Sequence, residues 1–142
     1  MMLKTDIILV SYNGSDDTIM CIESLWQMPS QGFRIIVVEN CSTDDSPKKL
    51  QKFVEGKRGI VCPVSTGTME RTEHRLCLLL SDSNKGFAAG NNIGIRFSTQ
   101  TADATFIWLL NNDTTVDSNA LNALIAGHEK RKEKRNTNPG IL

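Results

Sequence analysis

Residues 6–14 read DIILVSYNG, in which a short run of large aliphatic residues ends abruptly in a polar cluster. The same design recurs in RIIVVENCS at 34–42, LCLLLSDSNKG at 76–86 and TFIWLLNNDT at 105–114. Short, continuously apolar runs are typical of parallel strands that are covered on both faces. The sequence therefore predicts four buried strands, at 6–10, 33–38, 76–80 and 105–110.

Helical patterns alternate with these strands. After the first strand, Ser15 is expected to cap a helix whose apolar face includes Ile22 and Leu25, and Pro29 ends it. The other helices are predicted at 46–56, 86–98 and 118–135. Such alternation predicts a single α/β domain with a doubly wound, mainly parallel sheet.

Two segments fall outside this alternation. Residues 59–73 (GIVCPVSTGTMERTE) are rich in turn-forming residues without a clear period, so we expect a surface excursion or flap. Residues 129–135 (EKRKEKR) are expected to form a solvated helix end, with docking to anionic lipid as the alternative. His74 and His128 have no suitably placed Ser or Cys partner and are expected at the surface.

The composition limits the class of protein. The 16 basic and 16 acidic residues cancel, so no overall field draws the chain to nucleic acid. The four cysteines form no CxxC pair and have no nearby pair of histidines, which favours reduced thiols in the cytosol over a zinc site. No run approaches the ~18 apolar residues of a membrane-spanning helix.

The polar clusters that follow the four strands are expected to meet. In doubly wound sheets, ligands bind beyond the carboxyl ends of the strands, although each cluster alone could be a simple turn. Asp113, flanked by amides and hydroxyls, would suit Mg²⁺ or Mn²⁺ if phosphate oxygens completed the coordination. The stretch from Asn84 to Gly94 offers glycines, amides and Lys85 at a helix start, but it is neither GxGxxG nor a Walker A loop.

Four ordered blocks carry a family resemblance. They are VSYNG at 10–14, IIVVENCSTDDS at 35–46, NKGFAAGNNIGI at 84–95 and WLLNNDTTV at 108–116. Together they resemble the nucleotide-binding half of a family 2 glycosyltransferase with the GT-A fold, most like bacterial rhamnosyltransferase-type members. The resemblance spans nearly the whole chain.

The resemblance implies a donor site for a nucleoside-diphosphate sugar. It places Asp113 on a divalent metal, Mg²⁺ or Mn²⁺, at the position of a DxD-type motif. It also implies that Glu39 contacts the base or ribose, although this position is more commonly Asp. The residues implied to bind the nucleotide sugar are Ser11, Tyr12, Asn13, Glu39, Asn40, Ser42, Asn84, Lys85, Gly86, Asn91, Asn111 and Asn112.

The implied activity is transfer of a sugar, with inversion, to a saccharide or lipid-linked acceptor, as in polysaccharide biosynthesis. The catalytic base is expected beyond Leu142, because residues 1–142 match a donor domain without its acceptor-binding half. The protein is expected in the cytoplasm or at the inner face of the cytoplasmic membrane. Apolar surface that the absent acceptor-binding half would cover is expected to allow self-association. The alternatives are a non-catalytic nucleotide-sugar-binding module and a sugar nucleotidyltransferase, although the latter's glycine-rich activating loop is not evident.

Overall fold

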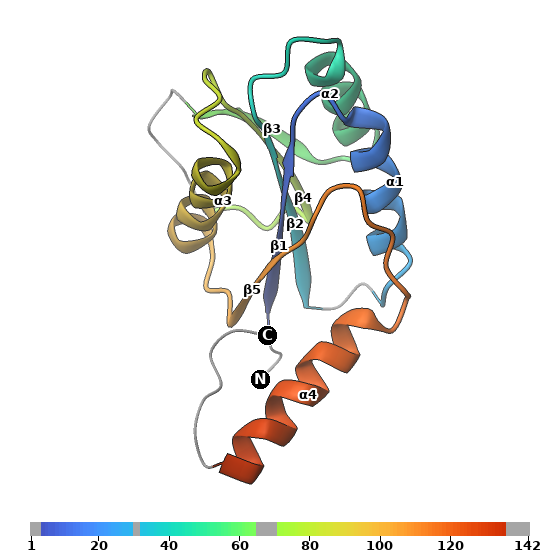
Figure 1. Cartoon of the computed structure of the whole chain (residues 1–142), viewed down its shortest axis with the longest axis vertical. Helices are drawn as coiled ribbons and strands as arrows, with labels where there is room; N and C mark the ends of the chain where they lie inside the picture. The colour runs from blue at the N-terminus through green and yellow to red at the C-terminus, as the bar shows by residue number, and fades with distance from the viewer. Residues whose placement is uncertain (1–3, 30–31, 65–70, 136–142) are drawn as a thin grey trace.

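The structure, a computed structural model, describes residues 4–29, 32–64 and 71–135. Strands and helices alternate along most of this chain, and the carboxyl-terminal helix α4 extends away from the sheet (Figure 1). The elements in order are β1 (Thr5–Ser11), α1 (Ser15–Trp26), β2 (Phe33–Glu39), α2 (Ser46–Gly56), β3 (Ile60–Pro63), β4 (Leu76–Leu80), α3 (Phe87–Thr101), β5 (Phe106–Leu109) and α4 (Ala120–Arg135).

The strands of the described residues form one parallel sheet with the order β3-β4-β2-β1-β5. The central strands β1 and β2 run in register from the pair Thr5 and Phe33 to the pair Ser11 and Glu39. The last residues of these two strands therefore lie side by side at the carboxyl edge. The predicted α/β class and parallel sheet are confirmed.

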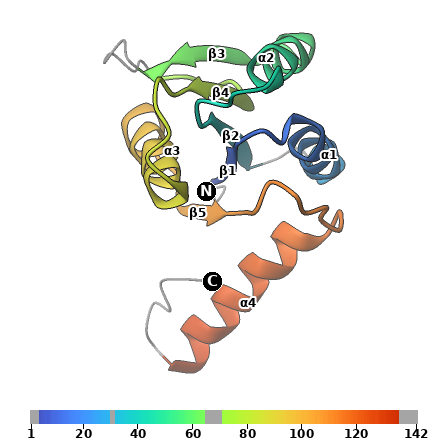
Figure 2. The same cartoon turned by 45° about the horizontal axis from the view of Figure 1, so that its top comes forward.

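Helices cover both faces of the sheet, which explains why the central strands are apolar throughout. Helix α3 lies on one face, and α1 and α2 lie on the other (Figure 2). Ile7 and Leu9 of β1 pack on the side of α1, whereas Ile8 packs with Phe97 of α3 on the opposite side. Alternate residues of one strand thus enter two separate cores.

Two expectations about strands are wrong. Ile60–Pro63, expected in a surface excursion, form an edge strand that pairs in parallel with β4. β5 was expected to be buried, but it lies at the other edge of the sheet and its residues alternate between half-buried and exposed. A continuous apolar run therefore does not distinguish an edge strand from a central one. Residues 65–70 of the predicted excursion lie outside the described residues.

Local chemistry at helix starts also differs from expectation. Ser15 is the first residue of α1, and its side chain does not cap the helix, because Gly14 occupies the cap position. The backbone N–H of Ser46, the first residue of α2, donates to Asp44 Oδ1 at 2.8 Å.

His128 was expected at the surface, yet it is buried and packs edge-on against Phe106, with 4.9 Å between ring centroids.

Other expectations hold within the described residues. All four cysteines are free thiols. The charged residues 129–134 of α4 are exposed, as expected for a solvated helix end. None of the described helices combines the length and the apolar character needed to cross a bilayer.

Candidate functional site

The loops that follow β1 and β2 are joined by the amide of Asn13. The backbone N–H of Asn13 donates to Ser42 Oγ at 2.9 Å, and Asn13 Oδ1 accepts the backbone N–H of Thr43 at 2.9 Å. Asn13 has a positive φ of 48°, a backbone conformation that asparagine tolerates better than most residues. Its side chain is therefore engaged in holding the two loops together.

Glu39 is the last residue of β2, and its side chain bonds to the loop that follows this strand. Only 2% of its surface is exposed, and its carboxylate accepts the Ser42 backbone N–H at 3.2 Å and also the Ser42 hydroxyl. Charge-assisted hydrogen bonds of this kind are among the stronger ones. This carboxylate, expected to contact the nucleoside, already has two partners within the protein.

The loop between β4 and α3 is anchored by a pair of asparagines. Asn40, 3% exposed, donates from Nδ2 to Asn84 Oδ1 at 3.1 Å and to the Gly86 carbonyl at 3.3 Å. Asn84 Oδ1 also accepts the Gly86 N–H at 2.8 Å. Gly86 has φ of 98°, which only glycine adopts readily, so the loop reverses there and leaves Lys85 exposed.

The other glycines of this stretch serve packing. A Cβ at Gly90 would lie 2.8 Å from Val10 Cγ1, and one at Gly94 would lie 2.6 Å from Ile8 Cγ2. Both residues therefore let α3 approach β1 more closely than any side chain would allow. Asn91, between them, is buried with 6% exposure.

The turn that follows β5 carries the expected metal ligand. The Thr114 hydroxyl donates to the Asn111 carbonyl at 2.6 Å, which closes the turn, and Asn112 Nδ2 donates to Thr18 Oγ1 at 3.0 Å. Asp113 is exposed at the tip. In the part of the chain that the structure describes, its carboxylate has no hydrogen bond or ion pair, and no group of three potential His, Cys, Asp or Glu ligands is present.

The buried thiol of Cys21 in α1 lies next to this turn, and the charge of Asp113 affects its pKa. Burial raises the pKa of the Cys21 thiol; a hydrogen bond with the Thr114 side chain opposes the rise, and the negative charge of Asp113 adds to it. Cys21 Sγ also lies 3.9 Å from the Asn111 carbonyl oxygen. The turn that carries Asp113 therefore lies next to α1.

The structure brings the four polar clusters together and, apart from Gly86 and the buried Asn91, divides the predicted residues into two groups. The side chains that bond within the protein belong to Ser11, Asn13, Glu39, Asn40, Ser42, Asn84 and Asn112. The side chains with no hydrogen bond or ion pair among the described residues, all exposed, belong to Tyr12, Lys85, Asn111 and Asp113. A ligand at this edge would meet the second group first.

Thr18 is a participant that the sequence reasoning missed. It lies in the first turns of α1, is fully buried, and its hydroxyl contacts both Asn112 and Ser11. The sequence does carry a pattern that indicates its position. Small side chains recur every three residues at Thr18, Cys21 and Ser24, and together they form a stripe beside the apolar face of this helix.

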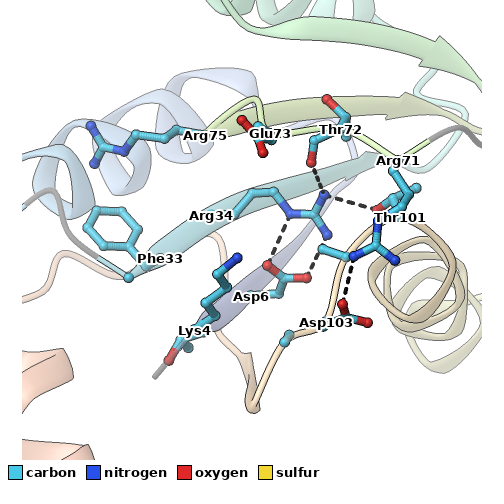
Figure 3. A pocket seen from close by; sticks show the side chains of 14 residues that line it. Lys4, Asp6, Phe33, Arg34, Arg71, Thr72, Glu73, Arg75, Thr101 and Asp103 are labelled. Atoms are coloured by element: carbon cyan, nitrogen blue, oxygen red, sulfur yellow. Dashed lines mark hydrogen bonds and ion pairs between the residues drawn. The ribbon is translucent and has the colours of Figure 1, made fainter. Parts of the chain in front are cut away.

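A cavity of about 680 Å³ lies at the opposite, amino-terminal edge of the sheet, near Lys4, Asp6 and Arg34 (Figure 3). Arg34 donates to Asp6 through Nε at 3.0 Å and Nη2 at 2.7 Å, and its Nη1 donates to Thr101 Oγ1 at 3.0 Å. These buried charges satisfy one another. None of the predicted site residues lines this cavity, so its size alone does not make it the functional site.

A parallel sheet covered on both faces, with a polar carboxyl edge, is the architecture of a Rossmann-like nucleotide-binding domain. The chain belongs to glycosyl transferase family 2, whose sequence profile matches residues 6–133. Family membership favours a glycosyltransferase over a sugar nucleotidyltransferase. No significant match was found among curated protein sequences.

Solved structures of glycosyltransferases share the fold. TarS 1–349 of S. aureus in complex with UDP-GlcNAc is 20% identical, with a TM-score of 0.66 over 90% of this chain and 32% of that one. The mannosyltransferase PcManGT of Pyrobaculum calidifontis, in complex with GDP-Man and Mn²⁺, is 16% identical, with a TM-score of 0.66 over 85% of this chain and 31% of that one. The chain thus spans about a third of the length of each. The fold is of the GT-A type.

Proposed function

We propose that the carboxyl edge of the sheet binds a nucleoside-diphosphate sugar together with a divalent cation, Mg²⁺ or Mn²⁺, as the donor site of a glycosyltransferase. The observation that carries the proposal is the exposed Asp113 carboxylate at the tip of the turn after β5, which has no hydrogen bond or ion pair within the described part of the chain. The complexes of the two similar structures, with UDP-GlcNAc in one and with GDP-Man and Mn²⁺ in the other, support the same ligand class.

The residues present fit a metal that is shared with its ligand. Asp113 supplies one hard, anionic ligand, and among the described residues no group of three His, Cys, Asp or Glu side chains forms a metal site. A single carboxylate holds such a cation weakly, so the diphosphate oxygens would complete the coordination. When bound, the metal would stabilise negative charge on the departing diphosphate.

Other exposed side chains that have no hydrogen bond or ion pair among the described residues suit the other parts of a nucleotide. Lys85 is an exposed cation near the amino end of α3, where backbone N–H groups favour anions, so it is assigned to the diphosphate. Tyr12, 47% exposed at the end of β1, can stack against a base or ribose. Glu39 holds the loop that contains Ser42 in place. We therefore assign recognition of the base to the side chains around Glu39 and not to Glu39 itself.

The proposed reaction is an inverting transfer, in which an acceptor hydroxyl attacks the anomeric carbon while the nucleoside diphosphate departs. This step needs a general base for the hydroxyl proton. The carboxyl-terminal half of α4, whose sequence includes Glu129 and Glu133, extends away from the sheet (Figure 1), so neither glutamate is assigned this task. The proposal therefore assigns the base to an acceptor-binding part of the fold, and the acceptor to a saccharide or a lipid-linked saccharide.

A donor-binding module without turnover is the second candidate, favoured by the unsuitable positions of these two glutamates. Release of free sugar from UDP-GlcNAc or GDP-Man in the presence of Mn²⁺ separates the two candidates. Hydrolysis or transfer by the 142-residue chain would contradict the module.

Calorimetry with UDP and GDP tests the proposed site. We expect Mn²⁺ to strengthen binding of the nucleoside diphosphate to the wild type, because Asp113 and two phosphates share the cation. Asp113→Asn should abolish this enhancement without loss of the fold, since asparagine also suits a turn but lacks the charge. Asp117→Asn, a neutralisation in the same loop at a residue that accepts the Asn119 N–H at 2.8 Å, is the matched control and should keep the enhancement. Equal enhancement in wild type and Asp113→Asn would contradict the proposal.

A further inference from the structure

Two hydrogen bonds attach helix α1 to the turn that carries Asp113, one on each side of that residue, in addition to the contact of Cys21 Sγ with the Asn111 carbonyl at 3.9 Å. Asn112, immediately before Asp113, donates from Nδ2 to Thr18 Oγ1 at 3.0 Å. Val116, three residues after Asp113, donates its backbone N–H to Ser24 Oγ at 3.1 Å. Asp113 therefore lies between two tethers, and both tethers attach to the same rigid element.

The Thr18 hydroxyl is the more constrained of the two attachments. Besides its bond with Asn112, Thr18 Oγ1 lies 2.8 Å from Ser11 Oγ and 2.8 Å from the Gly14 carbonyl oxygen. A hydroxyl has one hydrogen and two lone pairs, so three partners saturate it. Thr18 is fully buried, and water therefore cannot replace a missing partner without rearrangement.

The neighbouring loop holds the Asn112 amide from a second direction. A Cβ placed on Gly14 would lie 3.3 Å from Asn112 Nδ2, so the amide packs against the backbone of the β1–α1 loop. The contacts of Thr18 consequently join the end of β1, the start of α1 and the turn after β5. Residues 18 and 112 are 94 positions apart, so the bond joins the first turns of α1 to the turn after β5 across a long stretch of sequence.

We propose that Thr18 is a positioning residue for the donor site, which sets the orientation of the Asp113 turn through Asn112. The inference rests on the proposed function, because it assigns a role to the turn in metal and diphosphate binding. Partners in the layer outside a metal ligand orient that ligand, and their loss typically costs 10–100-fold in metal affinity or activity. Thr18 acts in this way without contacting the ligand itself.

Three variants test the role. Thr18→Val keeps the shape of the side chain but removes the hydroxyl, Thr18→Ser retains the hydroxyl, and Thr99→Val is the matched control. Thr99 is an exposed helical threonine whose hydroxyl donates to the Arg96 carbonyl at 3.0 Å, away from the site. In titrations of UDP with Mn²⁺, we expect Thr18→Val to reduce the Mn²⁺ enhancement of UDP affinity about ten-fold. Thr18→Ser should restore most of it, and Thr99→Val should leave it unchanged.

A measurement without ligand separates this inference from the proposed function. In nuclear magnetic resonance spectra of the ligand-free chain, Thr18→Val should shift the side-chain amide signal of Asn112 and broaden the backbone signals of 112–116, with Thr18→Ser close to wild type. If wild type shows no Mn²⁺ enhancement but these spectral changes occur, the proposed function fails and Thr18 still positions the turn. Unchanged spectra and an unchanged Mn²⁺ effect in Thr18→Val would overturn the positioning role.

Asn112→Ala tests the same bond from its exposed end, in case Thr18→Val does not fold. It should reproduce the loss of Mn²⁺ enhancement, and the double variant with Thr18→Val should lose no more than either single variant. Additive losses would show that the two residues act independently, which would contradict the proposal.

Discussion

At the scale of single residues, the buried Asp6 and Arg34 show why a charged pair can occupy the interior of this sheet. Their side chains are 4% and 8% exposed, and they meet at 2.7 Å. Ser98 Oγ donates to Asp6 Oδ2 at 2.6 Å, and Thr101 accepts from Arg34, so each member of the pair has a further hydrogen-bond partner. Removing charges from water is costly unless partners of this kind replace it.

We expect Asp6→Asn to destabilise the fold strongly, because it leaves the Arg34 charge buried without a counter-charge. Breaking one partner of a buried pair typically costs about 3–5 kcal/mol of unfolding free energy. Urea unfolding measures the effect. The control is Asp103→Asn, which neutralises the exposed partner of Arg71 beside the same cavity and should change stability little (Figure 3). Similar losses in the two variants would contradict this account.

At the same scale, the sequence predicts which loops come together better than it predicts which of their side chains bond within the protein. Asp113 and Lys85 were expected at the carboxyl edge, because parallel strands bring their following loops together, and the four loops do meet there. Asn13 and Glu39 were expected to bind a ligand, but each is engaged with the 42–44 loop. Such partnerships depend on three-dimensional proximity, so spacing along the chain does not reveal them.

At the scale of elements, prediction succeeds where pattern and position agree. β1 and β2 are apolar throughout because they are central strands, and their runs were sufficient to locate them. β3 was missed because it has four residues, is only partly buried and ends in a proline. β5 was misplaced because its sequence resembles a central strand although it lies at an edge. Edge position depends on strand order, which local periodicity does not contain.

The packing of α3 on β1 gives a prediction for a single methyl group. We expect Gly94→Ala to destabilise the chain by about 1–3 kcal/mol, because the new Cβ would lie 2.6 Å from Ile8 Cγ2 and force α3 away from the sheet. Gly127→Ala in α4 is the matched control, since a Cβ there meets nothing within 4 Å and alanine favours helix by up to about 1 kcal/mol. Thermal and urea unfolding give both values, and a neutral Gly94→Ala would show that the helix can shift freely.

At the scale of the whole molecule, the outer strand β5 leaves part of its apolar surface exposed. Within the described residues β5 pairs with β1 alone, and its Ile107 and Leu109 are 39% and 49% exposed. Both face the side of the sheet on which α3 packs, since they align with Asp6 and Ile8 of β1. α4 packs against the opposite face of β5, where its His128 contacts Phe106 with 4.9 Å between ring centroids.

An open, apolar strand edge is a template for pairing with another chain, so we expect the 142-residue chain to self-associate through β5 as its concentration rises. Pairing of two identical edges about a two-fold axis would bury Leu109 of both copies. Leu109→Lys should shift the equilibrium to the monomer in sedimentation velocity experiments, because a charge on the edge opposes pairing. Met20→Lys adds the same charge at a residue of α1 that is 59% exposed, and it should leave association unchanged. A wild-type chain that stays monomeric at millimolar concentration, or equal effects of the two substitutions, would show that the β5 edge does not drive association.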